Sequence, residues 1–113
     1  MTFDEGLADS VRRALQGLDG LGERRMFGGI AFLLRGNMAC GVLADRLIVR
    51  IGPDAYESAL DEPRVTPFDV TGRPMRGWVT VEVDAIDDDE ALRAWIDRAV
   101  GFALTLPPKV KEG

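Results

Sequence analysis

The sequence predicts a single two-layer α+β domain, in which a five-stranded antiparallel sheet carries its helices on one face. Three observations lead to this prediction. Apolar residues recur at helical spacing near both ends of the chain, alternating apolar and polar runs lie between them, and tight-turn residues join several of those runs. Strands joined by tight turns must be antiparallel, and such a sheet buries one face under helices. The expected element order is α-β-β-β-α-β-β-α.

The first helix is expected to begin with a capping box formed by Thr2 and Glu5. Each of these side chains can satisfy a backbone N–H that the first turn leaves free. The glycine-rich stretch 17–22 then ends the helix. The apolar face consists of Leu7, Val11, Ala14, Leu15 and Leu18.

Three strands are expected next, at about 26–34, 38–43 and 46–51, with turn residues between them. The third strand alternates, so that one set of its side chains faces the helices and the other set, which includes Arg50, faces away. The set expected to face the helices is Leu47, Val49 and Ile51.

A short helix, two more strands and a long helix complete the predicted domain. Pro53 is expected at the first helical position of the short helix, and Pro67 marks the weak strand 65–70 as an edge strand. In the strong strand 78–83, Trp78 is expected to face away from the helices. The residues expected to face them are Val79, Val81 and Val83.

The last helix has the clearest pattern in the chain. Acidic residues 87–90 place negative charge at its N-terminus, where capping and the helix dipole both favour it. An alternative use of these carboxylates is to hold a hard cation. The apolar stripe that follows consists of Leu92, Trp95, Ile96, Ala99, Val100 and Ala103.

Length and charge limit the function classes. The 113 residues predict one domain, residues 1–113, with a core at about 3–109. The net charge is −5, and only the segment 24–80 is basic, with eight Arg against six acidic residues. Duplex nucleic acid is therefore not an expected partner. No leader pattern and no apolar run of about 20 residues occurs, and the single cysteine fits a reducing compartment. A cytoplasmic protein without a membrane segment is expected.

The sequence contains no recognisable catalytic apparatus. It has no histidine, and Cys40 lies in an apolar run that predicts a buried structural thiol. A nucleophilic cysteine would need a neighbouring base. Gly28-Gly29 lies within a strand pattern, where glycine marks a bulge or a close approach of backbone. We therefore expect no enzyme, no catalytic residue, no metal site and no cofactor.

One constellation could bind a partner. Two arginines beside an aromatic ring can bind an anion, stack on a base or serve a protein interface. The competing interpretation is a solvated loop whose arginines pair with Glu82 or Asp69, and whose Met75 covers the indole. Alternation places Arg50 and Trp78 on the outward sheet face, and the adjoining loop 71–77 contributes the two arginines, so the candidate residues lie on that face and its loop. They are Arg50, Arg73, Arg76 and Trp78.

Six ordered segments carry a family resemblance that extends over about residues 3–109. They are Arg25-Met26-Phe27-Gly28-Gly29, Gly36-Asn37-Met38, Gly52-Pro53, Pro67-Phe68, Gly72-Arg73-Pro74-Met75-Arg76-Gly77-Trp78 and Leu106-Pro107-Pro108-Lys109. With them the chain resembles the N-terminal domain of the TfoX/Sxy family. The resemblance implies a fold like that of the type III secretion chaperones and a link to the regulation of bacterial competence genes. The full-length regulators also carry a C-terminal helical domain, and this sequence departs from them by ending at Gly113, so a stand-alone N-terminal domain is expected; the resemblance carries over no catalytic residues.

These observations predict a non-enzymatic protein-interaction module in bacterial transcriptional or competence-type regulation. The alternative is a small-ligand or single-stranded nucleic acid binder that uses the Arg/Trp surface. A homodimer is expected as well, because a two-layer fold leaves one sheet face or an edge strand open. Secretion chaperones are dimers, and two-fold symmetry is the commonest closed arrangement.

Overall fold

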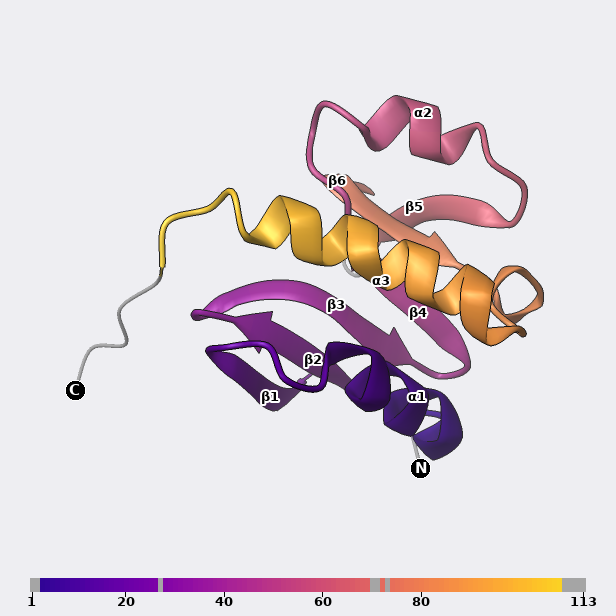
Figure 1. Ribbon diagram of the computed structural model, residues 1–113. Coiled ribbons are helices and arrows are strands. Elements are labelled where there is room, and N and C mark those ends of the chain that lie inside the picture. Colours follow the sequence, from indigo (N-terminus) through magenta and orange to yellow (C-terminus); the bar gives the residue numbers. More distant parts are fainter. Residues whose placement is uncertain (1–2, 27, 70–71, 73, 109–113) are drawn as a thin grey trace.

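The computed structural model describes residues 3–26, 28–69, 72 and 74–108. It confirms an α+β fold with an antiparallel sheet and three α-helices (Figure 1). The helices are α1 (Glu5–Leu15), α2 (Tyr56–Leu60) and α3 (Asp89–Ala103), and the 3-10 turn η1 (Val83–Ala85) precedes α3. The strands are β1 (Leu21–Met26), β2 (Gly29–Leu34), β3 (Asn37–Leu43), β4 (Arg46–Arg50), β5 (Val65–Asp69) and β6 (Pro74–Val81).

The described sheet has six strands, so the expectation of five was wrong. The strand order is β1-β2-β3-β4-β6-β5, and every neighbouring pair is antiparallel. The expected strand 26–34 is interrupted because Gly28 has a φ of 77°, which reverses the chain and pairs Met26 with Gly29. A Cβ atom on Gly29 would overlap the carbonyl oxygen of Val42. One glycine therefore turns the chain, and the other allows close contact between strands.

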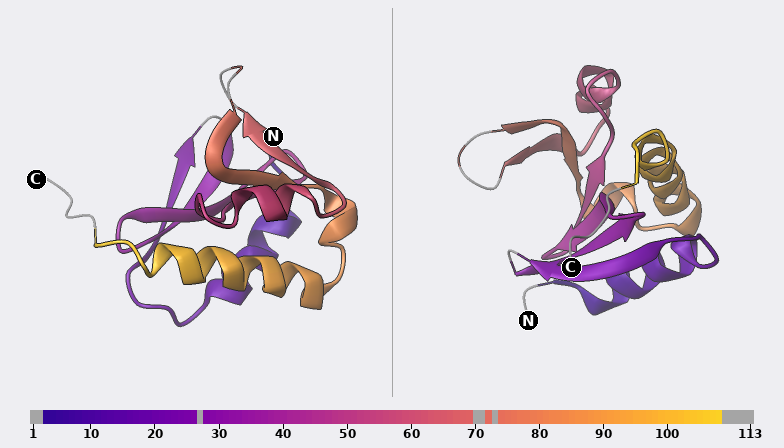
Figure 2. Two further views of the ribbon diagram at one scale, coloured as in Figure 1. Left: turned by 90° about the horizontal axis from the view of Figure 1, so that it is seen from above. Right: turned by 90° about the vertical axis from the view of Figure 1, so that its left-hand side faces the viewer.

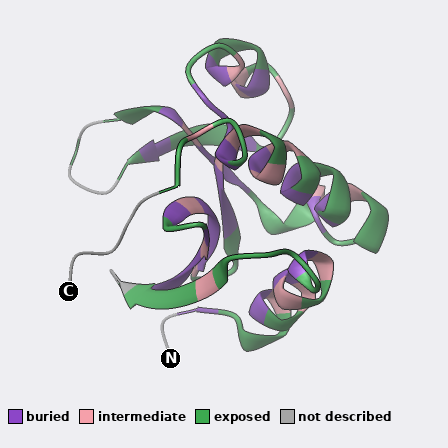
Figure 3. Ribbon diagram, turned by 60° about the vertical axis from the view of Figure 1, so that its left-hand side comes forward, coloured by how far each residue is buried: buried purple, intermediate pink, exposed green. Residues whose placement is uncertain are grey.

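All three helices contribute to one core on the same face of the sheet, as expected. Val11 of α1, Ala59 of α2 and Ile96 of α3 belong to the same cluster of buried residues. Figure 2 shows the arrangement of these helices, and Figure 3 shows the buried residues of the fold in purple. The strands supply the other half of this core, including the expected residues Leu47, Val49, Ile51, Val79 and Val81.

The structure corrects several local details of the prediction. Val83 is 40% exposed, because β6 ends at Val81 and the chain turns into η1. Asp4 caps α1 by accepting a hydrogen bond from the N–H of Leu7, whereas Thr2 lies outside the described residues. Leu18 lies beyond the end of α1 and is 36% exposed. Pro53 precedes α2 in a turn and does not occupy its first position.

The predicted cap of the last helix is confirmed. Asp88 is the N-cap of α3, and its carboxylate accepts a hydrogen bond of 2.7 Å from the N–H of Ala91. The predicted apolar stripe of α3 packs into the core, and its residues Leu92, Trp95 and Ile96 are all buried. The acidic run thus has a capping function at this helix.

The segment before α1 is tied to the turn between β3 and β4. Phe3 forms a parallel β-bridge with Ala44, and the N–H of Asp4 donates to the carbonyl oxygen of Ala44 at 2.7 Å. Phe3 is buried in the core. The start of the described chain is therefore anchored against a loop about forty positions away in the sequence.

The opposite sheet face, which we call the outer face, carries no described helix. In the right-hand view of Figure 2 the β5–β6 hairpin extends away from the three helices, so the sheet is strongly bent. Ile48 and Thr80 are neighbours on this face and are nevertheless buried, with exposures of 3% and 7%. Among the described helices, none has the length and apolar character needed to cross a membrane.

Candidate partner-binding face

Two of the four predicted site residues meet on the outer face. Arg50 ends β4 and is the direct cross-strand partner of Trp78 in β6. The guanidinium carbon of Arg50 lies 5.1 Å from the ring centroid of Trp78, within the range of a cation–π contact. Both side chains are half-buried. Strand alternation predicted that both residues face away from the helices, and their cross-strand pairing brings them together there.

A second aromatic residue completes the surroundings of Arg50, and sequence reasoning missed it. Phe102, near the end of α3, places its ring centroid 5.5 Å from the guanidinium carbon. It reaches this position because Gly52 has no side chain. A Cβ atom there would lie 2.5 Å from the Phe102 ring. The Gly52 φ of 90° also favours glycine. In the sequence, this glycine was the available signal that another group packs closely here.

Gly77 fixes β6 beside the end of β4. Its carbonyl oxygen accepts hydrogen bonds from the N–H groups of Ile51 at 2.8 Å and Gly52 at 3.0 Å. Its φ of 94° lies in the left-handed region, and pairing with β5 is irregular over this part of β6. This bulge keeps Trp78 opposite Arg50. It also changes the direction of the side chain that precedes Gly77, which is Arg76.

Arg76 does not join the Arg50–Trp78 pair, so the structure does not bring these predicted residues together. Its guanidinium lies 5.8 Å from the ring centroid of Tyr56 and 3.5 Å from a carboxylate oxygen of Glu57, both in α2. Simple alternation would place Arg76 and Trp78 on one face, but the bulge at Gly77 breaks the alternation. Arg73, the remaining predicted residue, lies outside the described residues.

The indole of Trp78 is contacted by residues other than the one considered from the sequence. The Phe68 ring centroid lies 6.2 Å from that of Trp78, in a tilted arrangement. Met75 is 41% exposed. Phe68 therefore links Trp78 to the neighbouring part of the outer face.

A hollow of about 400 Å³ lies on the outer face beside this aromatic pair. Ile48, Thr80 and Phe68 are its most buried lining residues, while Arg46 and Asp69 are exposed. The other lining residues are Leu43, Ala44, Thr66 and Pro67. The hollow thus combines an apolar floor with charges of both signs.

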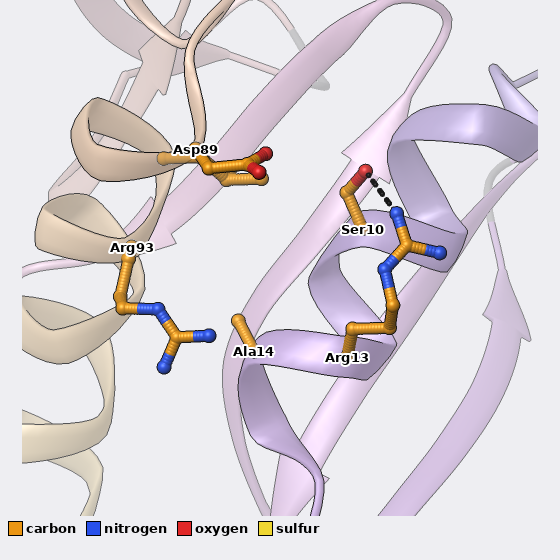
Figure 4. A pocket seen from close by; sticks show the side chains of 6 residues that line it. Ser10, Arg13, Ala14, Asp89 and Arg93 are labelled. Atoms are coloured by element: carbon orange, nitrogen blue, oxygen red, sulfur yellow. Dashed lines mark hydrogen bonds between the residues drawn. The ribbon is translucent and has the colours of Figure 1, made fainter.

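A smaller hollow of about 160 Å³ lies between α1 and α3. Figure 4 shows Asp89 directed toward α1 and Arg93 directed toward Ala14, while Arg13 turns back and donates to Ser10 at 3.2 Å. One carboxylate and two arginines line this space, and its volume is less than half that of the hollow on the outer face. It is a weaker candidate for a binding site than the outer face.

Cys40 is a buried structural thiol, as predicted. It is fully buried in the core, and burial raises the pKa of its thiol to about 12. At neutral pH the thiol is therefore protonated and a poor nucleophile. Within the described part of the chain, no group of three or more Cys, Asp or Glu residues is arranged to hold a metal ion.

Comparison with known proteins identifies the family. No curated protein and no solved structure matches the chain. The family profile of the TfoX N-terminal domain does match, over residues 13–103 of the 113. The match includes every strand of the sheet and both Arg50 and Trp78. The chain therefore belongs to the TfoX N-terminal domain family.

Proposed function

We propose that the protein is a non-enzymatic interaction module that binds another protein on its outer sheet face. The observation that carries this proposal is the hollow floored by Ile48 and Phe68 on the face that no described helix covers. Trp78 and Arg50 extend the same face toward the end of α3. Aromatic residues and arginine are enriched in the centres of protein interfaces.

Family membership supports a place for this module in bacterial regulation. The TfoX N-terminal domain is linked to the regulation of competence genes, and its fold resembles the secretion chaperones, which act by binding other proteins. The protonated, buried thiol of Cys40 and the absence of histidine from the sequence favour a binding role over a catalytic one. We therefore expect a component of the transcription machinery or its regulators as the partner.

The second candidate is a ligand or single-stranded nucleic acid that stacks on Trp78. Bases commonly stack on exposed aromatic rings beside basic residues. In this protein, however, Arg50 and Phe68 already contact the indole, and the net charge of −5 repels a polyanion. These observations favour a protein over a nucleic acid.

A second copy of the chain is proposed as one partner of the same face. Arg46 and Asp69 both line the hollow, and they lie at opposite ends of it, because Arg46 is next to the Val81 end of β6 and Asp69 pairs at the Pro74 end. A two-fold axis through the hollow would bring Arg46 of one copy to Asp69 of the other. Interfaces of this kind are self-complementary, with each charge pair occurring twice.

The binding proposal is tested by placing a large cation in the hollow. Thr66 is exposed and lines the hollow, so Thr66→Arg should keep the fold but block the face. Gln16→Arg makes the same charge change at an exposed position beyond α1 and serves as the control. Both variants should melt like the parent protein. In pull-downs from the host lysate, only Thr66→Arg should lose a transcription factor or polymerase component.

Two other outcomes are informative. Retention of the partner by Thr66→Arg would place binding elsewhere and contradict the proposal. RNA or nucleotide that co-purifies with the parent protein, and is lost from Thr66→Arg, would favour the second candidate.

A further inference from the structure

Arginines over aromatic rings are a recurring feature of this protein. Five of the described arginines take part, namely Arg12, Arg25, Arg50, Arg76 and Arg98. Three of the five also hold a carboxylate of the same chain: Arg12 with Asp9 and Glu23, Arg76 with Glu57, and Arg98 with Glu62. In these three the ring orients the guanidinium and an acidic residue neutralises it.

Arg50 departs from this pattern. It is half-buried between the rings of Trp78 and Phe102, yet within the described residues no carboxylate lies within ion-pair distance of it. Arg25 also has a ring and no described carboxylate, but it is exposed, and Phe3 is the one described ring that it contacts. Among the described arginines, Arg50 is thus the one that lies between two rings without a described counter-ion.

The hydrogen-bonding capacity of Arg50 is also largely unused. Its guanidinium is permanently charged and carries five N–H donors. The described chain supplies one acceptor, the carbonyl oxygen of Met38, at a long 3.5 Å from Nη1. Because Arg50 is half-buried rather than buried, the donors for which the described chain supplies no acceptor are open to a ligand.

We infer that Arg50 receives a carboxylate from the protein partner, with Trp78 and Phe102 holding the guanidinium in place. This inference rests on the proposed function for the identity of the partner as a protein. A carboxylate can accept two parallel hydrogen bonds from the fork of an arginine. Because the rings already restrict the side chain, less conformational entropy is lost on binding. The carboxylate belongs to an Asp or Glu side chain or to the C-terminus of a chain.

Charge favours a carboxylate over a phosphate at this site. The described contacts provide one positive charge, which matches one monoanion, and the whole chain carries a net charge of −5. A phosphate dianion would meet stronger repulsion from this field. A phosphorylated or nucleic acid ligand is therefore the alternative that the experiment must exclude.

The test uses the full chain and small probes of defined charge, observed by NMR. The reporters are the Nε–H of Arg50 and the indole N–H of Trp78. Arg98 and Trp95 are the matched control, because Arg98 lies 4.3 Å from the Trp95 ring centroid but already holds Glu62 at 3.0 Å. The probes are N-acetylglutamate amide, N-acetylglutamine, the neutral N-acetylglutamine amide and inorganic phosphate, with ionic strength held constant by chloride.

We expect N-acetylglutamate amide or N-acetylglutamine to shift the signals of Arg50 and Trp78 and to leave those of Arg98 and Trp95 in place. The first probe offers a side-chain carboxylate and the second a terminal one. The probe that binds more tightly therefore shows whether the partner supplies a side chain or a C-terminus. The neutral amide should have no effect. In Arg50→Gln the response of Trp78 should disappear, whereas Arg50→Lys should keep part of it, and the amide spectrum shows whether each variant is folded.

Three results would overturn the inference: no response of Arg50 to either carboxylate, equal responses at Arg50 and Arg98, or a larger response to phosphate. The proposed function is tested separately by Thr66→Arg. If that variant loses the partner but the Arg50 signals do not respond to carboxylates, the result supports the interaction face and contradicts the carboxylate site.

Discussion

At the scale of residues, local alternation was enough to find the pair at the centre of the candidate site. Arg50 and Trp78 lie opposite each other because both strands are regular up to those positions. Phe102 and Arg76 could not be placed in this way. Phe102 comes from a helix about fifty positions later, and Arg76 is re-aimed by the bulge at Gly77. A bulge depends on how the paired strands fit together, so no short-range sequence pattern specifies it.

Gly52 should be the residue of this region that is least tolerant of a side chain. Gly52→Ala combines an unfavourable φ of 90° with a contact at 2.5 Å to the Phe102 ring. Gly17→Ala, with a φ of 92° and no atom within 4 Å, carries only the backbone penalty of about 1–2 kcal/mol. Denaturant unfolding should show a larger loss of stability for Gly52→Ala.

The Phe102→Ala background isolates the cause of that difference. Removing the ring should reduce the effect of Gly52→Ala to that of Gly17→Ala, since only the backbone term then remains. Equal losses for the two glycine variants in the parent protein would show that Phe102 does not confine Gly52.

At the scale of elements, strongly patterned segments were predicted and a weakly patterned one was missed. The stripe of α3 and the valines of β6 left little ambiguity. The strand β1 was missed because Glu23, Arg24 and Arg25 occupy its centre and no apolar alternation exists there. As an edge strand it has only one neighbouring strand, so its pattern is weakly constrained. Charges on such an edge also discourage pairing with other chains.

The position where β6 ends predicts how an added charge affects stability at two nearby valines. Val81 is fully buried and Val83 is 40% exposed, although both were expected to face the helices. Val81→Asp buries an unpaired carboxylate, which costs several kcal/mol and should lower the Tm by roughly 10 °C or more. Val83→Asp should change stability by less than about 0.5 kcal/mol.

Thermal melts of the two variants decide this prediction, and the parent protein provides the reference. If Val83→Asp is as destabilising as Val81→Asp, the strand continues beyond Val81 and η1 is wrongly placed.

At the scale of the whole molecule, the fold class followed from the sequence, but the shape of the open face did not. Helix and strand patterns show which residues are apolar, and antiparallel pairing follows from short turns. The hollow depends instead on the strand order, in which β6 lies between β4 and β5, and on the bend of the sheet. Both features join residues distant in sequence, so a single chain gives no direct signal of them.

The proposed dimer predicts a charge-reversal pattern in sedimentation. The parent protein should approach twice its chain mass of 12.3 kDa as concentration rises. Arg46→Glu and Asp69→Arg should each favour the monomer, because each puts like charges together across the two-fold axis. The double variant restores opposite charges and should dimerise again.

Arg64→Glu is the control for this series, because Arg64 is an exposed arginine that pairs with Asp84 within one chain. It should leave the association constant unchanged. A parent protein that sediments as a monomer at high concentration would refute the dimer, and failure of the double variant to recover would move the interface away from the hollow.

The anchoring of Phe3 and Asp4 to Ala44 has a consequence for the order in which the chain folds during synthesis. The helix α1 leaves the ribosome before the β3–β4 turn, because the backbone group that holds its start is made about forty residues later. An isolated helix of 11 residues is marginal in water. The segment therefore waits, largely unstructured, until the β3–β4 hairpin has emerged and closed the long loop. Because α1 packs against α3 as well as β3, and α3 is made last, part of its apolar stripe stays exposed on the nascent chain until α3 has emerged, and chaperones that recognise apolar segments can bind it until then.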